Sequence, residues 1–193
     1  MTVLVSTRRS AARERLLDAA DELFYDRGVQ QVSIEDVVVR AGTTRMTLYR
    51  HFPSKDDLVL AHLQRRADEE RAALADVLAV AARGRYSPLL VLAARIKDDV
   101  AAPGFRGCPF LNVAAEYRDP THPVRRLVAA HRAWFRSRLV DLVADTGALD
   151  PEGVADRIVM LRDGAMTAGA LREAPAPARA LPQAVAAVLG VRT

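Results

Sequence analysis

Apolar residues recur along this chain of 193 residues at intervals of three and four positions, the spacing of one face of an α-helix. Near the N-terminus, Leu16, Ala20 and Leu23 show this spacing, and Gly28 follows at a position that suits the end of the helix. Runs in which β-branched and polar residues alternate, which would indicate strands, are missing. The pattern predicts an all-α fold of about nine helices.

Capping residues predict where several of these helices begin. Ser33 is followed three positions later by Asp36, and this capping-box pattern predicts a helix over residues 34–40. Ser54, Ser87 and Asp150 predict three further starts. The other helices are expected over residues 10–27, 44–51, 109–117 and 123–145, with a Pro/Ala-rich linker over residues 173–182 before a last short helix.

Residues 34–51 carry the pattern of a helix-turn-helix, two short helices joined by a tight turn that contains glycine. The second helix of such a motif enters the major groove of DNA, and Arg45 and Thr47 would lie near its N-terminus, where side chains reach base edges. Lys55 would begin the next helix, where its ammonium group and the free backbone N–H groups suit a phosphate. The candidate DNA-binding residues are Ser33, Thr44, Arg45, Thr47, Tyr49, His51 and Lys55. An ordinary solvated helix with capping hydroxyls fits the same pattern.

Three segments are similar to the DNA-binding head of a known family. They are AADELFYDRG (19–28), VSIEDVVVRAG (32–42) and TLYRHFPSKDDL (47–58), and they resemble the tetracycline-repressor (TetR) family of bacterial regulators. The third segment is the most specific, because it combines Leu-Tyr-x-His-Phe with a following Ser-Lys and Leu. The chain departs from the family at Val29, where an aromatic residue is usual, and at Val38, where alanine is usual. Both departures affect packing, and neither removes a DNA-contacting group.

The resemblance implies a DNA-binding domain over residues 1–53 and a larger helical ligand-binding and dimerisation domain over residues 54–193. A member of this family would be a homodimeric transcriptional repressor, released from a palindromic operator in double-stranded DNA by a small-molecule effector. An architectural or activating role on DNA is a competing interpretation. Outside DNA-binding proteins, the alternative is a helical small-molecule-binding or enzymatic bundle with a vestigial DNA-binding head.

Residues of the second domain that combine apolar bulk with a few polar groups are candidates for the effector pocket. They are Phe105, Phe110, Asn112, Glu116, Tyr117, His131 and Trp134. Most of them come from residues 104–127, which also resemble a stretch found in one branch of the family. Packing of Trp134 in an ordinary core is the competing interpretation.

Small residues on the helix expected from Pro151 are spaced so that another helix can approach closely. Glycine within a helix costs about 1 kcal/mol relative to alanine, so two glycines there indicate a packing reason. The candidate dimer-interface residues are Gly164, Ala165, Ala168, Gly169, Leu181, Val185 and Val188. Tight packing within one chain is the competing interpretation.

Charge adds modest support for nucleic-acid binding. The net charge is +4, and nearly all of the positive charge is arginine. Between Arg40 and Arg66 the chain has six Lys/Arg residues and two Asp/Glu residues, which agrees with a DNA-binding role for this segment.

Other functions lack support in the sequence. No Ser/His/Asp set, Gly-rich phosphate loop or pair of carboxylates at catalytic spacing is present, so we do not expect an enzyme. The four histidines and Cys108 show no metal-ligand spacing, and we expect no metal or other cofactor. A single cysteine agrees with a reducing compartment, and no apolar run approaches the roughly 18 residues that span a bilayer, so a cytoplasmic location is expected. A redox role for Cys108 would need surroundings that lower its pKa.

Overall fold

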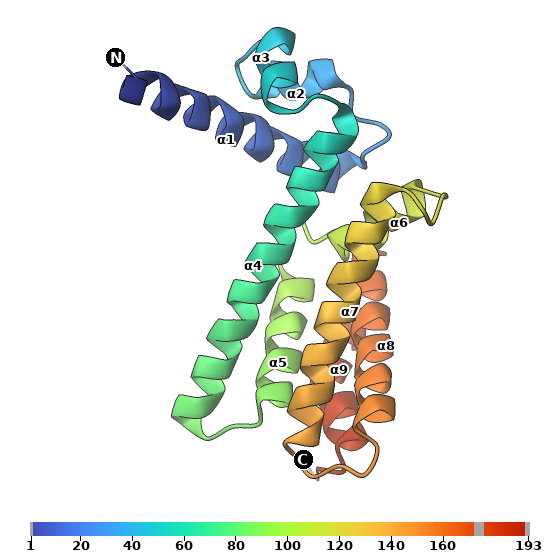
Figure 1. Cartoon of the computed structure of the whole chain (residues 1–193). Coiled ribbons are helices and arrows are strands. Elements are labelled where there is room, and N and C mark those ends of the chain that lie inside the picture. The colour runs from blue at the N-terminus through green and yellow to red at the C-terminus, as the bar shows by residue number, and fades with distance from the viewer. Residues whose placement is uncertain (1, 172–175, 192–193) are drawn as a thin grey trace. The chain divides into compact units, whose positions relative to one another are not determined.

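The computed structural model of the chain describes residues 2–171 and 176–191, and within these the side chains of residues 11–171 and 179–191. All regular secondary structure in these ranges is helical (Figure 1). The helices are α1 (Thr2–Arg27), α2 (Ile34–Arg40), α3 (Arg45–His51), α4 (Lys55–Gly84), α5 (Pro88–Ala101), α6 (Pro109–Glu116), α7 (Pro123–Ala144), α8 (Pro151–Ala170) and α9 (Ala176–Val188). The prediction of an all-α fold with an N-terminal helix-turn-helix and a larger helical part is confirmed.

Two helices begin earlier than the sequence indicated. α1 begins at Thr2 rather than near Ser10, because no glycine or proline interrupts the chain between these positions. α9 begins at Ala176, inside the predicted linker. Pro177 lies in its first turn, where a backbone N–H has no partner within the helix and its loss costs little. Residues 173–175 of that linker lie outside the described residues.

The chain divides into two compact units. Unit 1 consists of Met1–Arg66 and Pro109–Val128, and unit 2 consists of Ala67–Cys108 and Ala129–Thr193. The three divisions along the chain fall within α4, directly before α6 and within α7, so α6 belongs to unit 1.

Unit 1 has an apolar core and a buried polar cluster. Its most deeply buried large side chains include Leu16, Leu48 and Phe110. α1 packs against α2 and α3, and a polar cluster joins α1 to α4. In this cluster the Nδ1 atom of buried His62 bonds the carboxylate of buried Asp21, which also accepts a hydrogen bond of 3.1 Å from Nε of Arg65.

Unit 2 is a bundle in which α9 packs against α5 and α8 (Figure 1). Leu89 of α5, Ile158 of α8 and Val185 of α9 are buried there. No helix of the described part of the chain is both long enough and apolar enough to cross a membrane.

Candidate nucleic-acid interface

α2 begins at the predicted capping box, which is confirmed. The Oγ atom of Ser33 accepts a hydrogen bond of 3.1 Å from the backbone N–H of Asp36, whose carboxylate accepts one of 2.8 Å from the backbone N–H of Ser33. The Ser33 hydroxyl also donates to this carboxylate, and these bonds hold the pKa of Asp36 below its ordinary value. A phosphate contact by the Ser33 hydroxyl would therefore have to displace its bond to Asp36.

The turn after α2 is closed by two backbone hydrogen bonds. The N–H of Gly42 donates to the carbonyl of Val39 (3.2 Å), and the N–H of Thr43 donates to the carbonyl of Val38 (2.9 Å). This pair of bonds is a Schellman motif. Gly42 adopts a φ of 59°, in the left-handed region that favours glycine, so its backbone conformation accounts for glycine in this turn.

α3 is capped at its start and anchored by buried side chains. The Oγ1 atom of Thr44 accepts a hydrogen bond of 3.2 Å from the backbone N–H of Thr47 and donates one of 3.1 Å to the Thr47 hydroxyl. Leu48 and Phe52 are buried in the core of unit 1, and His51 is half-buried beside Phe52. Burial of Leu48 and of Phe52, which follows the last residue of α3, therefore fixes which face α3 turns to solvent.

The exposed face of α3 carries Arg45, Met46, Tyr49 and Arg50. Met46 is 80% exposed and Tyr49 is 49% exposed, large values for apolar and aromatic side chains. Sequence reasoning selected Arg45 and Tyr49 but missed Met46 and Arg50. The signal that could have found them is their spacing, because Met46 and Arg50 are four positions apart, as Arg45 and Tyr49 are, and residues four apart are neighbours on a helix surface.

Arg45 is held by a carboxylate from α2. Its Nε atom donates a hydrogen bond of 2.7 Å to Oε2 of Glu35, and the two side chains are 66% and 55% exposed. Among the described residues, the terminal Nη atoms of Arg45 make no hydrogen bond. The outer end of this guanidinium is thus available to an acceptor outside the chain.

Lys55 begins α4 next to two acidic side chains. The Oγ atom of Ser54 accepts a hydrogen bond of 3.1 Å from the backbone N–H of Asp57, which caps the helix at the predicted position. Lys55 is half-buried, and this burial lowers the pKa of its ammonium group, whereas the negative charges of Glu116 and Asp56 oppose the shift. Lys55 is therefore a cation at the start of α4 whose charge two carboxylates partly balance.

Glu116, the last residue of α6, holds the turn between α1 and α2. Its Oε1 atom accepts a hydrogen bond of 3.0 Å from the backbone N–H of Val29, and its Oε2 atom accepts one of 2.6 Å from that of Gln30. A Cβ atom at Gly28 would lie 3.0 Å from Oε1, so glycine leaves room for this carboxylate. Sequence reasoning missed this role because the contact joins residues 87 positions apart and has no local pattern.

Tyr117 fastens the segment after α6 to the start of α4. Its hydroxyl donates a hydrogen bond of 2.7 Å to Oδ1 of Asp56, and its ring lies against that of His122. Burial of the phenol, and then this bond to Asp56, raise the pKa of Tyr117 well above its ordinary value. In the structure Tyr117 holds the segment after α6 against the start of α4. An effector contact by Tyr117 stays a prediction.

The seven predicted pocket residues are divided between the two units. Unit 1 contains Phe110, Asn112, Glu116 and Tyr117, whereas unit 2 contains Phe105, His131 and Trp134. They therefore do not line one cavity within either unit.

Unit 2 does contain a small cavity, of about 90 Å³. Apolar side chains of α4, α5, α7 and α8 line it together with charged ones that include Glu70 and Arg162. None of the predicted pocket residues lines it, but Nε2 of the buried His131 lies 3.0 Å from Oε2 of Glu70. Trp134 lies one turn along α7 from His131, and its ring is covered by the guanidinium of Arg71 at 5.2 Å.

The predicted dimer-interface residues also separate into two groups. Gly169 packs within the chain, since a Cβ atom there would lie 2.5 Å from Cγ1 of Val100 and 3.0 Å from the ring of Phe105. Leu181 and Val185 are buried within unit 2 as well. At these three positions the structure shows packing within one chain, which is the competing interpretation.

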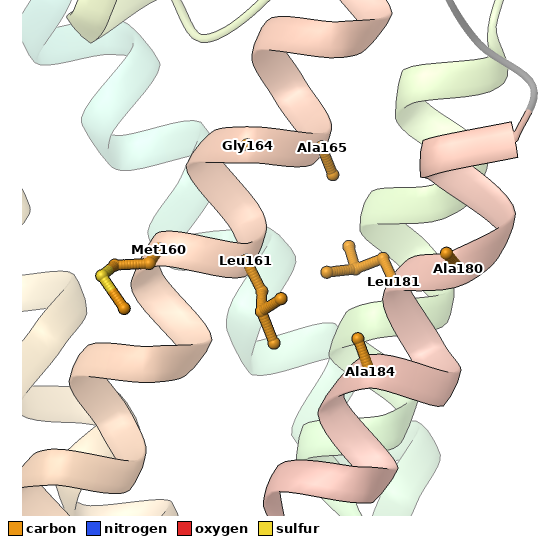
Figure 2. Close-up of a pocket in the computed structure, with 7 residues that line it drawn as sticks. All are labelled: Met160, Leu161, Gly164, Ala165, Ala180, Leu181 and Ala184. Carbon is orange, nitrogen blue, oxygen red and sulfur yellow. The ribbon is translucent and has the colours of Figure 1, made fainter.

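Of the other predicted interface residues, Gly164 and Ala165 line a shallow apolar groove between α8 and α9 (Figure 2), whereas Ala168 and Val188 do not. Its volume is about 260 Å³, and Leu161 and Leu181 extend into the space between the two helices. Gly164 is exposed, and a Cβ atom there would meet no atom of the described residues within 4 Å. Met160, on the same rim, is 66% exposed. An uncovered apolar strip therefore runs along α8 and α9.

Cys108 is buried in unit 2, and the two Nη atoms of Arg162 lie 3.8 and 3.9 Å from its Sγ atom. Arg162 is itself buried, and Nη1 donates a hydrogen bond of 3.0 Å to Asp163. Within the described ranges, no group of three or more His, Cys, Asp or Glu side chains is placed to hold a metal ion.

Two family profiles match the chain. The family described as "Bacterial regulatory proteins, tetR family" matches residues 16–62, and "Tetracyclin repressor-like, C-terminal domain" matches residues 89–185. The first match contains the whole helix-turn-helix, and the second alone covers half of the chain.

Solved structures and curated sequences give the same result. The TetR-family transcriptional regulator SCO4454 from Streptomyces coelicolor is 42% identical, with a TM-score of 0.87 over 94% of this chain and 95% of that one. The TetR transcriptional regulator sav143 from Streptomyces avermitilis is 28% identical, with a TM-score of 0.79 over 94% of this chain and 99% of that one. The transcriptional activator FasR of Mycolicibacterium smegmatis is 45% identical over 60 residues, 31% of this chain and only 27% of FasR.

Proposed function

Because the chain belongs to the TetR family of bacterial regulatory proteins, we propose that it is a sequence-specific DNA-binding regulator that acts as a homodimeric repressor. In this proposal a small-molecule effector releases the dimer from a palindromic operator. Residues 1–53 provide DNA binding, and residues 54–193 provide effector binding and dimerisation. A repressor of bacterial genes acts on the chromosome, so the proposal includes a cytoplasmic location.

The observation that carries DNA binding is the exposed face of α3. Arg45 and Tyr49 project from a helix whose opposite face is anchored by Leu48 and Phe52. In the major groove, Arg45 would donate to a guanine and Met46 would contact a thymine methyl group. The proposed DNA contacts are those of Ser33, Thr44, Arg45, Thr47, Tyr49, His51 and Lys55, extended by Met46 and Arg50.

Dimerisation is supported by the uncovered strip along α8 and α9. Exposed apolar surface of this kind marks interaction sites in many proteins. Gly164 leaves room for a helix of a second copy, and Met160 offers a large flexible side chain to it. A dimer with twofold symmetry presents two α3 helices, which is why the operator would be palindromic.

The effector site is proposed for unit 2, around the cavity beside Glu70. The cavity of about 90 Å³ is smaller than the roughly 300–1,000 Å³ of pockets for drug-sized ligands. Effector binding must therefore enlarge it, and the energy for that change comes from tighter binding to the enlarged state. His131 bonds Glu70, which lines the cavity, and Trp134 lies one turn further along the same helix, α7. Both therefore remain candidates for orienting the effector.

An activating role is the second candidate function. FasR is an activator by name, and it is 45% identical over its matched segment. That similarity covers 31% of this chain, and a DNA-binding head serves a repressor and an activator equally well. It therefore does not favour activation over repression.

A reporter assay tests the proposed direction of regulation. Genomic fragments that the full-length chain retards in a gel would be placed before a reporter gene, with and without expression of the protein. Repression predicts lower reporter output when the protein is expressed, and an Arg45→Ala variant as control should leave output high. Higher output with the wild-type protein would instead identify an activator.

A further inference from the structure

Glu35 and Arg45 form an ion pair on the surface proposed to face DNA. We propose that Glu35 is a positioning residue for base recognition: it fixes the plane of the Arg45 guanidinium so that both Nη atoms can address one guanine. This inference rests on the proposed DNA-binding function. It adds a residue that does not itself need to touch DNA.

The geometry of the pair leaves the recognition end of Arg45 open. Only Nε of Arg45 bonds to Glu35, at 2.7 Å. An arginine recognises guanine with two N–H donors directed at O6 and N7, and the terminal Nη atoms can supply both. A carboxylate that accepts a hydrogen bond from Nε therefore restricts rotation of the guanidinium without occupying the two Nη donors.

A second ion pair of the same unit shows the contrasting arrangement. Arg40 donates from Nε to Oε2 of Glu22 at 2.9 Å, and its Nη2 atom donates to both oxygens of the same carboxylate. These side chains are 55% and 56% exposed, close to the values for Arg45 and Glu35. The Nη2 atom of Arg40 is thus occupied within the chain, whereas the Nη atoms of Arg45 bond none of the described residues.

The position of Arg45 argues against a purely stabilising role for the pair. Arg45 is the first residue of α3, where the helix dipole disfavours a positive charge. Glu35 lies in the first turn of α2, where a negative charge is favoured. Exposed ion pairs contribute little to folding stability, but ordering a long arginine side chain before binding removes part of the entropy cost of the DNA contact.

The carboxylate of Glu35 also affects binding to DNA of any sequence. An acidic group near the DNA repels phosphates, so Glu35 weakens binding to any duplex. Loss of Glu35 should therefore lower discrimination between sequences and at the same time raise affinity for random DNA. A residue that only stabilised the fold would not produce these two opposite effects.

The test compares variants of the full-length chain on defined duplexes. Wild-type protein first selects its preferred site from a randomised duplex library. Binding is then measured by fluorescence anisotropy on that site, on versions with each guanine of a half-site replaced, and on random duplex. The variants are Glu35→Ala, Glu35→Gln, Arg45→Ala, the double variant Glu35→Ala with Arg45→Ala, and Glu22→Ala as the matched control.

We expect Glu35→Ala to reduce discrimination at one guanine by about three- to tenfold, part of what a bidentate arginine–guanine contact provides. The reduction should disappear in the Arg45→Ala background, and Glu35→Gln, which keeps an acceptor for Nε, should retain most of the discrimination. Glu22→Ala should leave discrimination unchanged, and the thermal midpoints of Glu35→Ala and wild type should agree.

Four outcomes would overturn the inference. Full discrimination by Glu35→Ala would mean that Arg45 needs no positioning. If Glu35→Ala reduced discrimination equally in the Arg45→Ala background, Glu35 would read a base directly. An equal loss in Glu22→Ala would mean that any broken ion pair of the unit has this effect. If wild-type protein selects no sequence at all, the proposed DNA-binding function fails, and the positioning role fails with it.

Discussion

The carboxylate of Glu116 accepts a hydrogen bond of 3.0 Å from the backbone N–H of Val29, and so closes a contact between α6 and the turn that precedes α2. A second bond, from the N–H of Gln30, makes the contact bidentate. Because this turn leads directly into the helix-turn-helix, Glu116 supports the candidate DNA-binding surface from a distant part of the sequence.

Removal of this carboxylate should destabilise unit 1. Glu116→Ala leaves the backbone N–H of the buried Val29 without its acceptor, at a cost of about 1–3 kcal/mol, whereas water can replace the acceptor of the exposed Gln30. Glu116→Gln, which keeps one acceptor oxygen, should lose less. Urea denaturation followed by circular dichroism measures both, with the exposed Asp76→Ala as control. If Glu116→Ala unfolds at the wild-type urea concentration, the contact contributes nothing to stability.

Asp21 should make stability depend on acid pH. Burial raises the pKa of Asp21, but the hydrogen bond from His62 and the positive charges of Arg66 and Arg65 outweigh it, so the pKa lies below the ordinary value of 3.8. The contribution of Asp21 to stability is therefore complete above that value and is lost as pH falls through the folded-state pKa.

Asp21→Asn tests this dependence. The variant should be less stable by about 3 kcal/mol near neutral pH, because it removes a buried carboxylate that accepts hydrogen bonds from His62 and Arg65. The difference in unfolding free energy from wild type should shrink as pH is lowered below the ordinary value of 3.8 and through the folded-state pKa. A difference that stays constant over this range would show that the carboxylate does not titrate as its surroundings imply.

Two glycines on α8 should respond differently to the same substitution. Gly169→Leu places a side chain against Val100 and Phe105 and should lower the thermal midpoint, because it overpacks the core. At Gly164 a Cβ atom would meet no atom of the described residues within 4 Å, so Gly164→Leu should leave folding intact while it weakens the proposed dimer. Sedimentation velocity and thermal unfolding of both variants separate the effects. A fully dimeric Gly164→Leu protein would place the dimer interface elsewhere.

Salt dependence should separate charged from neutral DNA contacts. Each neutralised phosphate contributes about −0.9 to the slope of log K against log salt, so Lys55→Ala should make the slope of a dimer shallower by about 2. Tyr49→Phe removes a neutral donor and should weaken binding with nearly the same slope. Titrations over a salt series measure both. An unchanged slope for Lys55→Ala would point to the arginines near the N-terminus, such as Arg13, as the charged contacts.

Local signals in the sequence were sufficient for most of the fold. The capping boxes at Ser33 and Ser54 and the glycine of the turn at Gly42 act through neighbours within a few positions, so their helix bounds could be predicted. The start of α9 was missed because proline in a first turn looks the same in sequence as proline in a linker.

Contacts between distant residues could not be predicted in this way. Glu116 resembled a pocket residue because its sequence neighbours are apolar, yet its partners are backbone groups 86 and 87 positions away. Gly169 and Gly164 share one helix and one residue type, and only their neighbours in space distinguish them. The pairing of Glu35 with Arg45 depends likewise on the angle that the turn sets between α2 and α3.

The most direct test of sequence-specific recognition by α3 is the ratio of two affinities. Full-length protein would be titrated, at one salt concentration, against the duplex that it selects and against a duplex of the same base composition in scrambled order. If α3 reads base sequence, the selected duplex binds at least about 10³-fold more tightly, and Arg45→Ala lowers this ratio. Equal affinities for the two duplexes, with equal salt dependence, would contradict sequence-specific recognition by α3.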